Sequence, residues 1–128
     1  MKLGVTELPG GYIAQETPSI KQVVHSFDWS DECVVTDMGH GPTVLRIVGV
    51  VESLAERLAV NAACEQARKE DTLLYFPSEE GRADDHYYQV RTSPVIWTPL
   101  TASEYTYEFT ATALVPYIYD ATTDERVT

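Results

Sequence analysis

The chain has 128 residues, a mass of 14.3 kDa and a formal net charge of −11, from 20 acidic and 9 basic residues. This length fits one domain, and a chain of this size buries roughly two-thirds of its unfolded surface, enough for a core without disulfide bonds or metal ions. Because the few basic residues are not clustered, binding to nucleic acid or to an anionic membrane surface is not expected.

The sequence also lacks the signals of membrane insertion, export and structural zinc. No apolar run approaches the roughly 18 residues that a membrane-spanning helix needs. The start of the chain, MKLGVTELPGG, has no apolar stretch of the signal-peptide type, so export is not expected. Cys33 and Cys64 lack the paired spacing of zinc ligands. Buried free thiols in a reducing compartment are the favoured interpretation, and a disulfide bond is the alternative.

The first part of the chain predicts an arm followed by strands. Residues 1–20 are rich in glycine and proline and are expected to form an N-terminal arm or loop, with a short strand around residues 12–14. The sequence VVHSFDW at 23–29 alternates in hydropathy, as in a strand, and residues 33–35 continue it after a polar interruption. DMGHGP at residues 37–42 has the composition of a turn.

A central strand and a helix come next. Residues 43–52 are rich in β-branched side chains and predict a central strand, in which Gly49 marks a bulge or a close backbone approach. Ser53 and Glu56 have the spacing of a capping box, so the Ser53 hydroxyl should accept from the third helical amide while Glu56 reaches back to the cap amide. An amphipathic helix is therefore predicted at about residues 53–69.

The helix is expected to pack on a sheet through its apolar and alanine faces. A polar face carries Glu56, Arg57, Arg68 and Lys69. Small side chains would allow a close approach to the sheet. The residues expected on the packed faces are Leu54, Leu58 and Ala62, flanked by Ala55, Ala59, Ala63 and Ala67.

The remainder of the chain predicts strands joined by short turns. Residues 72–76 read as a short buried strand and residues 78–85 as a polar loop. Residues 86–92 alternate again, until Ser93-Pro94 breaks or bulges the strand. Residues 104–114 show the clearest alternation in the chain.

Strands on both sides of one helix predict an α+β fold. We expect a single helix lying across an antiparallel sheet that closes into a barrel or a sandwich. The expected organisation is an N-terminal arm or loop at residues 1–20, a single domain at 21–116 and a C-terminal arm at 117–128.

The densest group of chemically active side chains is Asp84-Asp85-His86, which we interpret as a polar loop entering a strand. An enzyme would also need a third oriented group and a cleft, and the sequence identifies neither. His25 falls on the aromatic side of its strand and indicates a core or interface position. His40 stands between two glycines, without the Lys and Ser/Thr of a phosphate-binding loop. We therefore expect no catalytic residue, no cofactor and no metal ligand, and the protein is not expected to be an enzyme.

Tyrosine is the remaining unusual feature, with eight in the chain. Its ring and polar tip suit subunit interfaces. A segment that leaves the domain after Pro116 has little core left to fill, so its aromatic side chains favour an interface. The candidate subunit-interface residues are Tyr12, Tyr117, Ile118 and Tyr119.

This order of elements, over about residues 20–120, resembles small tail proteins of tailed viruses. The resemblance lies in Val48-Gly49-Val50 before the helix, in Tyr87-Tyr88-x-Val90, and in the aromatic strand that leads into Val115-Pro116-Tyr117. Tube, terminator, distal-tail and baseplate-hub proteins share such a fold, a barrel or sandwich flanked by one helix. The resemblance therefore implies the same architecture for this chain.

The resemblance also implies a structural virion protein that forms part of a tail or baseplate ring around the DNA channel. Its partners would be further copies in a hexameric or trimeric ring and neighbouring tail or baseplate proteins, contacted through sheet edges and arms. Neither sequence-specific nucleic acid binding nor membrane binding is implied. The protein would be made in the host cytoplasm and reside in the virion tail.

A second hypothesis is a small intracellular ligand-binding module or enzyme subunit with a helix-on-barrel fold. It would use His25, Asp84, Asp85 or His86. The two hypotheses differ in simple observables, because a ring protein should self-associate or bind neighbouring tail proteins. A binding module should instead be monomeric or dimeric, with a ligand that raises its melting temperature.

Overall fold

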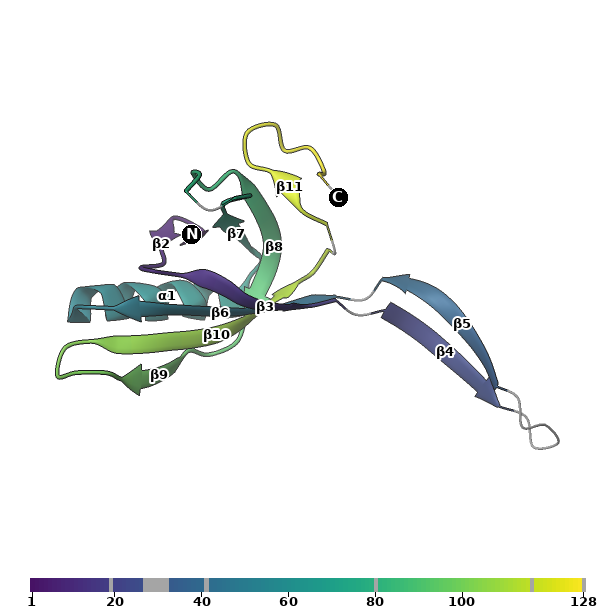
Figure 1. Cartoon of the computed structure of the whole chain (residues 1–128), viewed down its shortest axis with the longest axis horizontal. Coiled ribbons are helices and arrows are strands. Elements are labelled where there is room, and N and C mark those ends of the chain that lie inside the picture. The colour runs from purple at the N-terminus through teal and green to yellow at the C-terminus, as the bar shows by residue number, and fades with distance from the viewer. Residues whose placement is uncertain (19, 27–32, 41, 80, 116, 128) are drawn as a thin grey trace.

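The computed structural model describes residues 1–18, 20–26, 33–40, 42–79, 81–115 and 117–127, with the backbone alone for 20–26 and 33–40. Across these residues it shows a mostly antiparallel open sheet of nine strands, a separate two-stranded hairpin and one helix (Figure 1). The elements are β1 Lys2–Leu3, β2 Thr6–Glu7, β3 Tyr12–Thr17, β4 Ile20–Ser26, β5 Cys33–His40, β6 Thr43–Val51, α1 Leu54–Lys69, β7 Thr72–Phe76, β8 His86–Thr92, β9 Ile96–Pro99, β10 Tyr105–Ala113 and β11 Tyr119–Asp120.

The predicted α+β fold with one flanking helix is confirmed, but the sheet does not close into a barrel. Its strand order is β2-β1-β7-β8-β10-β6-β3, with β9 beside β10 and β11 beside β8. Within the described part of the chain no ladder joins β2 to β3, the two ends of this order. The chain turns between them because Pro9 lacks an amide hydrogen and Gly10 adopts a φ of 60°. The prediction that the sheet closes into a barrel is therefore wrong.

The strands predicted at residues 43–52 and 104–114 are confirmed as β6 and β10, and the structure shows that they pair along their whole length. Their register runs from Tyr105 opposite Val51 to Ala113 opposite Thr43. Side chains on one face of the pair form the centre of the core. The fully buried core residues of these two strands are Leu45, Ile47, Val51, Tyr107, Phe109, Ala111 and Ala113.

Gly49 marks a close approach, as predicted, although the approaching group is a side chain. In the register it lies opposite Tyr107, whose ring occupies the space that a Cβ at residue 49 would need. The Tyr107 hydroxyl continues past the glycine and donates a hydrogen bond of 3.0 Å to the Pro9 carbonyl. A buried tyrosine thus fastens the turn between β2 and β3 to the central strands.

The predicted helix and its cap are confirmed, with one difference in the cap. The Ser53 hydroxyl accepts from the Glu56 amide at 3.3 Å. The Glu56 carboxylate reaches the amide of Glu52 at 3.1 Å, one residue before the expected cap amide. This closes the first turn of α1 and relieves its unpaired amides.

The helix packs on the sheet through only part of the expected face, because Ala67 is buried and Ala63 packs against the core while Ala55 and Ala59 are exposed. Its buried residues are Val60, Cys64 and Ala67. Leu54 and Leu58 are instead 69% and 60% exposed, so the prediction that their stripe packs on the sheet is wrong. The Thr92 hydroxyl on β8 donates to the Cys64 carbonyl at 2.9 Å, which fixes the side of the helix that carries Cys64 to β8.

The first 17 residues differ from the expected arm, because they belong to the sheet. β1 pairs with both β2 and β7, and β3 pairs with β6. Leu3 and Leu8 are buried in the core. Strands of two residues are too short to show any alternation, so composition alone pointed to a loop.

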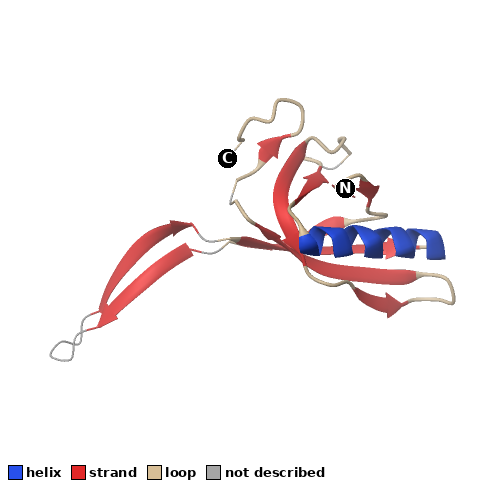
Figure 2. Ribbon diagram, turned by 180° about the vertical axis from the view of Figure 1, so that it is seen from behind, coloured by secondary structure: helices blue, strands red, loops and turns tan. Residues whose placement is uncertain are grey.

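The hairpin of β4 and β5 projects from one end of the sheet, as Figures 1 and 2 show. Its register pairs Val24 with Val35 and Ser26 with Cys33. The predicted turn at residues 37–42 is wrong, because β5 continues through His40 opposite Ile20. The predicted turn residues 37–40 therefore lie along a strand, in a hairpin that forms its own two-stranded sheet. Residues 27–29 of the predicted strand lie outside the described residues.

Candidate functional site

The Asp84-Asp85-His86 segment is occupied by structural contacts. The Ser78 amide and hydroxyl each donate to the Asp85 carboxylate at 2.7 Å, which closes the loop between β7 and β8. The Asp84 carboxylate lies 3.2 Å from the α-amino group of Met1. His86 begins β8, opposite Asp120, with its ring edge-on to Phe76. Each of the three side chains therefore stabilises the fold around the start of β8.

The pKa of Asp85 lies below its ordinary value, because the Ser78 hydroxyl and then the Ser78 amide hydrogen-bond its charged form. Its contribution to stability is therefore present above the unfolded-state pKa of about 3.9 and is lost as the pH falls through the lower folded-state value. The Asp85→Asn variant should be less stable than the wild type at pH 7. The difference in the free energy of unfolding should shrink as the pH falls below about 3.9. Urea unfolding at pH 7 and pH 3 measures it, and a difference as large at pH 3 as at pH 7 would contradict the explanation.

Cysteine and metal chemistry receive no support from the described residues. Cys64 is a free, buried thiol, and burial raises its pKa to about 12, so the reactive thiolate does not form near neutral pH. Among the described side chains, no three His, Cys, Asp or Glu residues gather closely enough to hold a metal ion. The side chains of His25, Cys33 and His40 lie outside the described ones.

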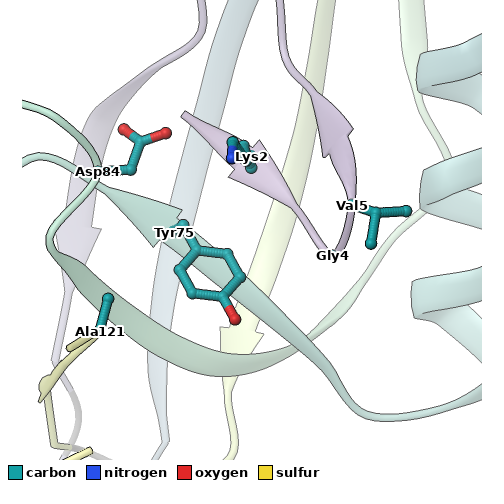
Figure 3. A pocket seen from close by; sticks show the side chains of 6 residues that line it. All are labelled: Lys2, Gly4, Val5, Tyr75, Asp84 and Ala121. Atoms are coloured by element: carbon teal, nitrogen blue, oxygen red, sulfur yellow. The ribbon is translucent and has the colours of Figure 1, made fainter. Parts of the chain in front are cut away.

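A cavity of about 350 Å³ lies beside the N-terminal strands. Figure 3 shows Lys2 from β1, Tyr75 from β7 and Asp84 from the following loop around it, with Gly4, Val5 and Ala121 completing the lining. Asp84 is the one member of the predicted acidic segment that lines this cavity. The cavity brings together a cation, a carboxylate and a phenol, and it is near the lower size limit of small-molecule sites, about 300 Å³.

The four candidate interface residues fall in two environments. Tyr12 lies on the outermost strand of the main sheet, β3, and is 56% exposed. The other three are half-buried by contacts within the C-terminal segment, with β8 and with the core. The Arg126 guanidinium lies 3.4 Å from the Tyr117 ring centroid, Tyr119 stacks on Tyr87, and the Ile118 carbonyl accepts from Val127. The C-terminal segment thus folds back against β8 rather than leaving the sheet freely.

A cluster made by Arg57, Trp97 and Tyr105 was not predicted from the sequence. The guanidinium carbon of Arg57 lies 4.3 Å from the Tyr105 ring centroid and 5.0 Å from that of Trp97. We call these three residues the Arg57 cluster. Its members come from α1, β9 and β10, and their separation along the chain exceeds any local motif. Strand pairing of Trp97 with Tyr107 and of Pro99 with Tyr105 brings them together.

Comparison with known proteins leaves the chain without an assigned family. No family model matches the sequence, and no curated protein matches it either. In the part of the chain that the structure describes, no helix is long and apolar enough to cross a membrane.

Proposed function

We propose that the chain is a structural virion protein, a subunit of a tail or baseplate ring of a tailed virus, and that it assembles by contacts between subunits around the DNA channel. The resemblance of its strand and helix sequences to small tail proteins supports this proposal. The observation that carries it is the projecting hairpin of β4 and β5. The protein would act in the virion tail after synthesis in the host cytoplasm.

The composition and pairing of the hairpin favour a contact with a neighbouring subunit. In the described strands, β4 and β5 pair with each other and with no third strand. A two-stranded hairpin without further packing is marginally stable in water. The sequences IKQVVHS and CVVTDMGH are nevertheless rich in apolar and β-branched residues. Pairing or packing of this hairpin with another subunit would supply the neighbour that the described strands do not provide.

Other features support assembly through the same kind of contact. β3 is an outermost strand with an exposed Tyr12, and open strand edges pair readily with other chains. Tyr117, Ile118 and Tyr119 remain candidate interface residues at the C-terminal end. A contact between different surfaces of identical subunits closes into a ring when its rotation divides a full turn, which a trimer or hexamer satisfies.

Replacing the hairpin tests this function. Thr17 pairs with Val44, so residues 18–43 can be replaced by Asn-Gly, a two-residue turn suited to the shortened ladder. The full chain should form a discrete oligomer in light scattering on a sizing column, at low or molar salt. The hairpin-less variant should be a monomer that still unfolds cooperatively on heating, as a folded domain does. Equal oligomer masses for the two proteins would show that the hairpin is not the assembly contact.

The cavity beside Lys2, Tyr75 and Asp84 favours a second candidate function, a small ligand-binding module. The Lys2 ammonium group and the Asp84 carboxylate, which also contacts the Met1 α-amino group, would suit a polar small molecule. In this case the full chain should remain monomeric or dimeric, and a ligand from a polar metabolite screen should raise the melting temperature. The Lys2→Ala variant should lose that increase.

A further inference from the structure

The Arg57 cluster presents a cation that lacks the usual partner. Arg46, Arg68, Arg82 and Arg91 each lie within ion-pair distance of a carboxylate. Among the described residues, Arg57 has no such partner, although the chain carries 20 acidic residues. Its guanidinium instead lies over two aromatic rings.

Stacking orients this guanidinium for recognition. The rings of Trp97 and Tyr105 attract the cation and restrict its rotation, while its N–H groups stay available to a carboxylate. An oriented guanidinium can hold a carboxylate through two parallel hydrogen bonds. Trp, Tyr and Arg are also the residues most enriched among those that dominate binding energy at protein interfaces.

Exposed leucines accompany the cluster. Leu54 and Leu58 precede and follow Arg57 on the exposed side of α1, and Leu100 begins the turn between β9 and β10. Leu100 is 55% exposed. Apolar side chains around an oriented cation fit a partner that presents apolar residues beside a carboxylate.

Acidic residues at this end limit which partners fit. Glu52, Glu56 and Glu104 adjoin the cluster in sequence, and Glu56 is engaged in the helix cap. A broadly acidic surface would be repelled by these carboxylates. A narrow element that brings one carboxylate to Arg57 and apolar residues to the leucines would not.

We propose that the Arg57 cluster receives the β4–β5 hairpin of a second copy of this chain, with a hairpin carboxylate paired to Arg57. This inference rests on the proposed role of the hairpin as an assembly arm. The hairpin segment, residues 20–40, has the required chemistry. Its sequence combines apolar residues with four acidic residues and one lysine: Asp37 on β5, and Asp28, Asp31 and Glu32 outside the described residues, against Lys21.

The topology makes the contact intermolecular. β6 begins at Thr43, beside the hairpin, and ends at Val51, opposite Tyr105 of the cluster. The nine residues of this strand separate the two features by about 30 Å. Figure 1 shows the hairpin at one end of the molecule and the start of α1, with the turn between β9 and β10, at the other. A head-to-tail contact of this kind repeats from subunit to subunit and forms a ring or a filament.

Mixing two variants tests the inference. Arg57→Glu keeps the hairpin and disables the cluster, whereas the hairpin-less variant keeps the cluster. Each alone should self-associate at least about tenfold more weakly than the full chain, because a charge reversal leaves the partner's carboxylate unpaired. An equimolar mixture should form a heterodimer that grows no further, since one intact hairpin and one intact cluster remain. Light scattering and analytical ultracentrifugation measure both results.

The control variant is Arg68→Glu, an exposed arginine of the same helix, which should assemble like the wild type. Circular dichroism must show that Arg57→Glu is folded, and Arg57→Gln serves if it is not. If Arg57→Glu assembles normally while the hairpin-less variant is monomeric, the cluster is not the receptor but the hairpin remains the arm. If the hairpin-less variant assembles normally, the proposed function fails. If the full chain is monomeric at every concentration, a second copy of the chain is not what binds the Arg57 cluster, and the inference is overturned.

Discussion

Substitution of Gly49 by alanine is expected to destabilise the fold by about 3–5 kcal/mol, the cost of losing a large aromatic side chain from a core. An added Cβ would overlap the ring and hydroxyl of Tyr107 on the paired strand. Tyr107 is fully buried and hydrogen-bonded to the Pro9 carbonyl, so its ring has no free volume into which to move. Either the ring leaves its position or β6 separates from β10. Urea unfolding followed by circular dichroism measures the loss.

A double-mutant cycle separates this overlap from the general preference of strands for residues other than glycine. Tyr107→Leu removes the ring and should itself be destabilising. In that background, Gly49→Ala should cost far less than in the wild type, because the overlapping atoms are gone. Equal costs in the two backgrounds would show that the close approach does not limit residue 49.

The features predicted correctly are those encoded by neighbouring residues. The alternation of residues 104–114 reflects one buried and one more accessible face, and that pattern needs no knowledge of the partner strand. The capping box places Ser53 three residues before Glu56, within hydrogen-bonding reach along one turn. The break at Ser93-Pro94 was also predicted from adjacent residues, because proline cannot donate a backbone hydrogen bond. There the Ser93 hydroxyl accepts from the Thr110 amide, and the Ser93 amide donates to the Thr110 carbonyl.

The features that could not be predicted depend on contacts between distant segments. The sequence of α1 offers two apolar stripes, and the sheet decides which one is buried. The sheet buries the smaller stripe of Val60, Cys64 and Ala67, which joins Tyr107 and Phe109 in one core cluster. Openness of the sheet likewise depends on how the two outermost strands end.

The candidate site follows the same division. Asp84 and Asp85 are conspicuous in the sequence because they are adjacent to each other and to His86. In the structure they hold a loop in place, because Asp85 accepts from Ser78 and Asp84 contacts the amino group of Met1. The Arg57 cluster is inconspicuous because its members are up to 48 positions apart in the numbering, from residue 57 to residue 105. Its significance comes from a missing ion pair, which only the fold reveals.

Placing a carboxylate on each side of α1 distinguishes the two helix faces directly. Ala67→Glu should destabilise the protein by at least about 4 kcal/mol, because Ala67 is fully buried and the charged group would have no partner in the core. Ala62→Glu, on the exposed face, should change the free energy of unfolding by less than about 0.5 kcal/mol. Alanine and glutamate differ little in helix propensity, so the contrast measures burial.

Urea unfolding at one fixed protein concentration measures both variants, because an assembling protein has an apparent stability that depends on concentration. Ala67→Glu should also lose the hydrogen bond between the Thr92 hydroxyl and the Cys64 carbonyl, since lifting the helix separates these groups. If Ala62→Glu lost much free energy of unfolding and Ala67→Glu lost little, the orientation of the helix described above would be contradicted. Leu54 and Leu58 would then be buried, and they would not be exposed leucines beside the Arg57 cluster.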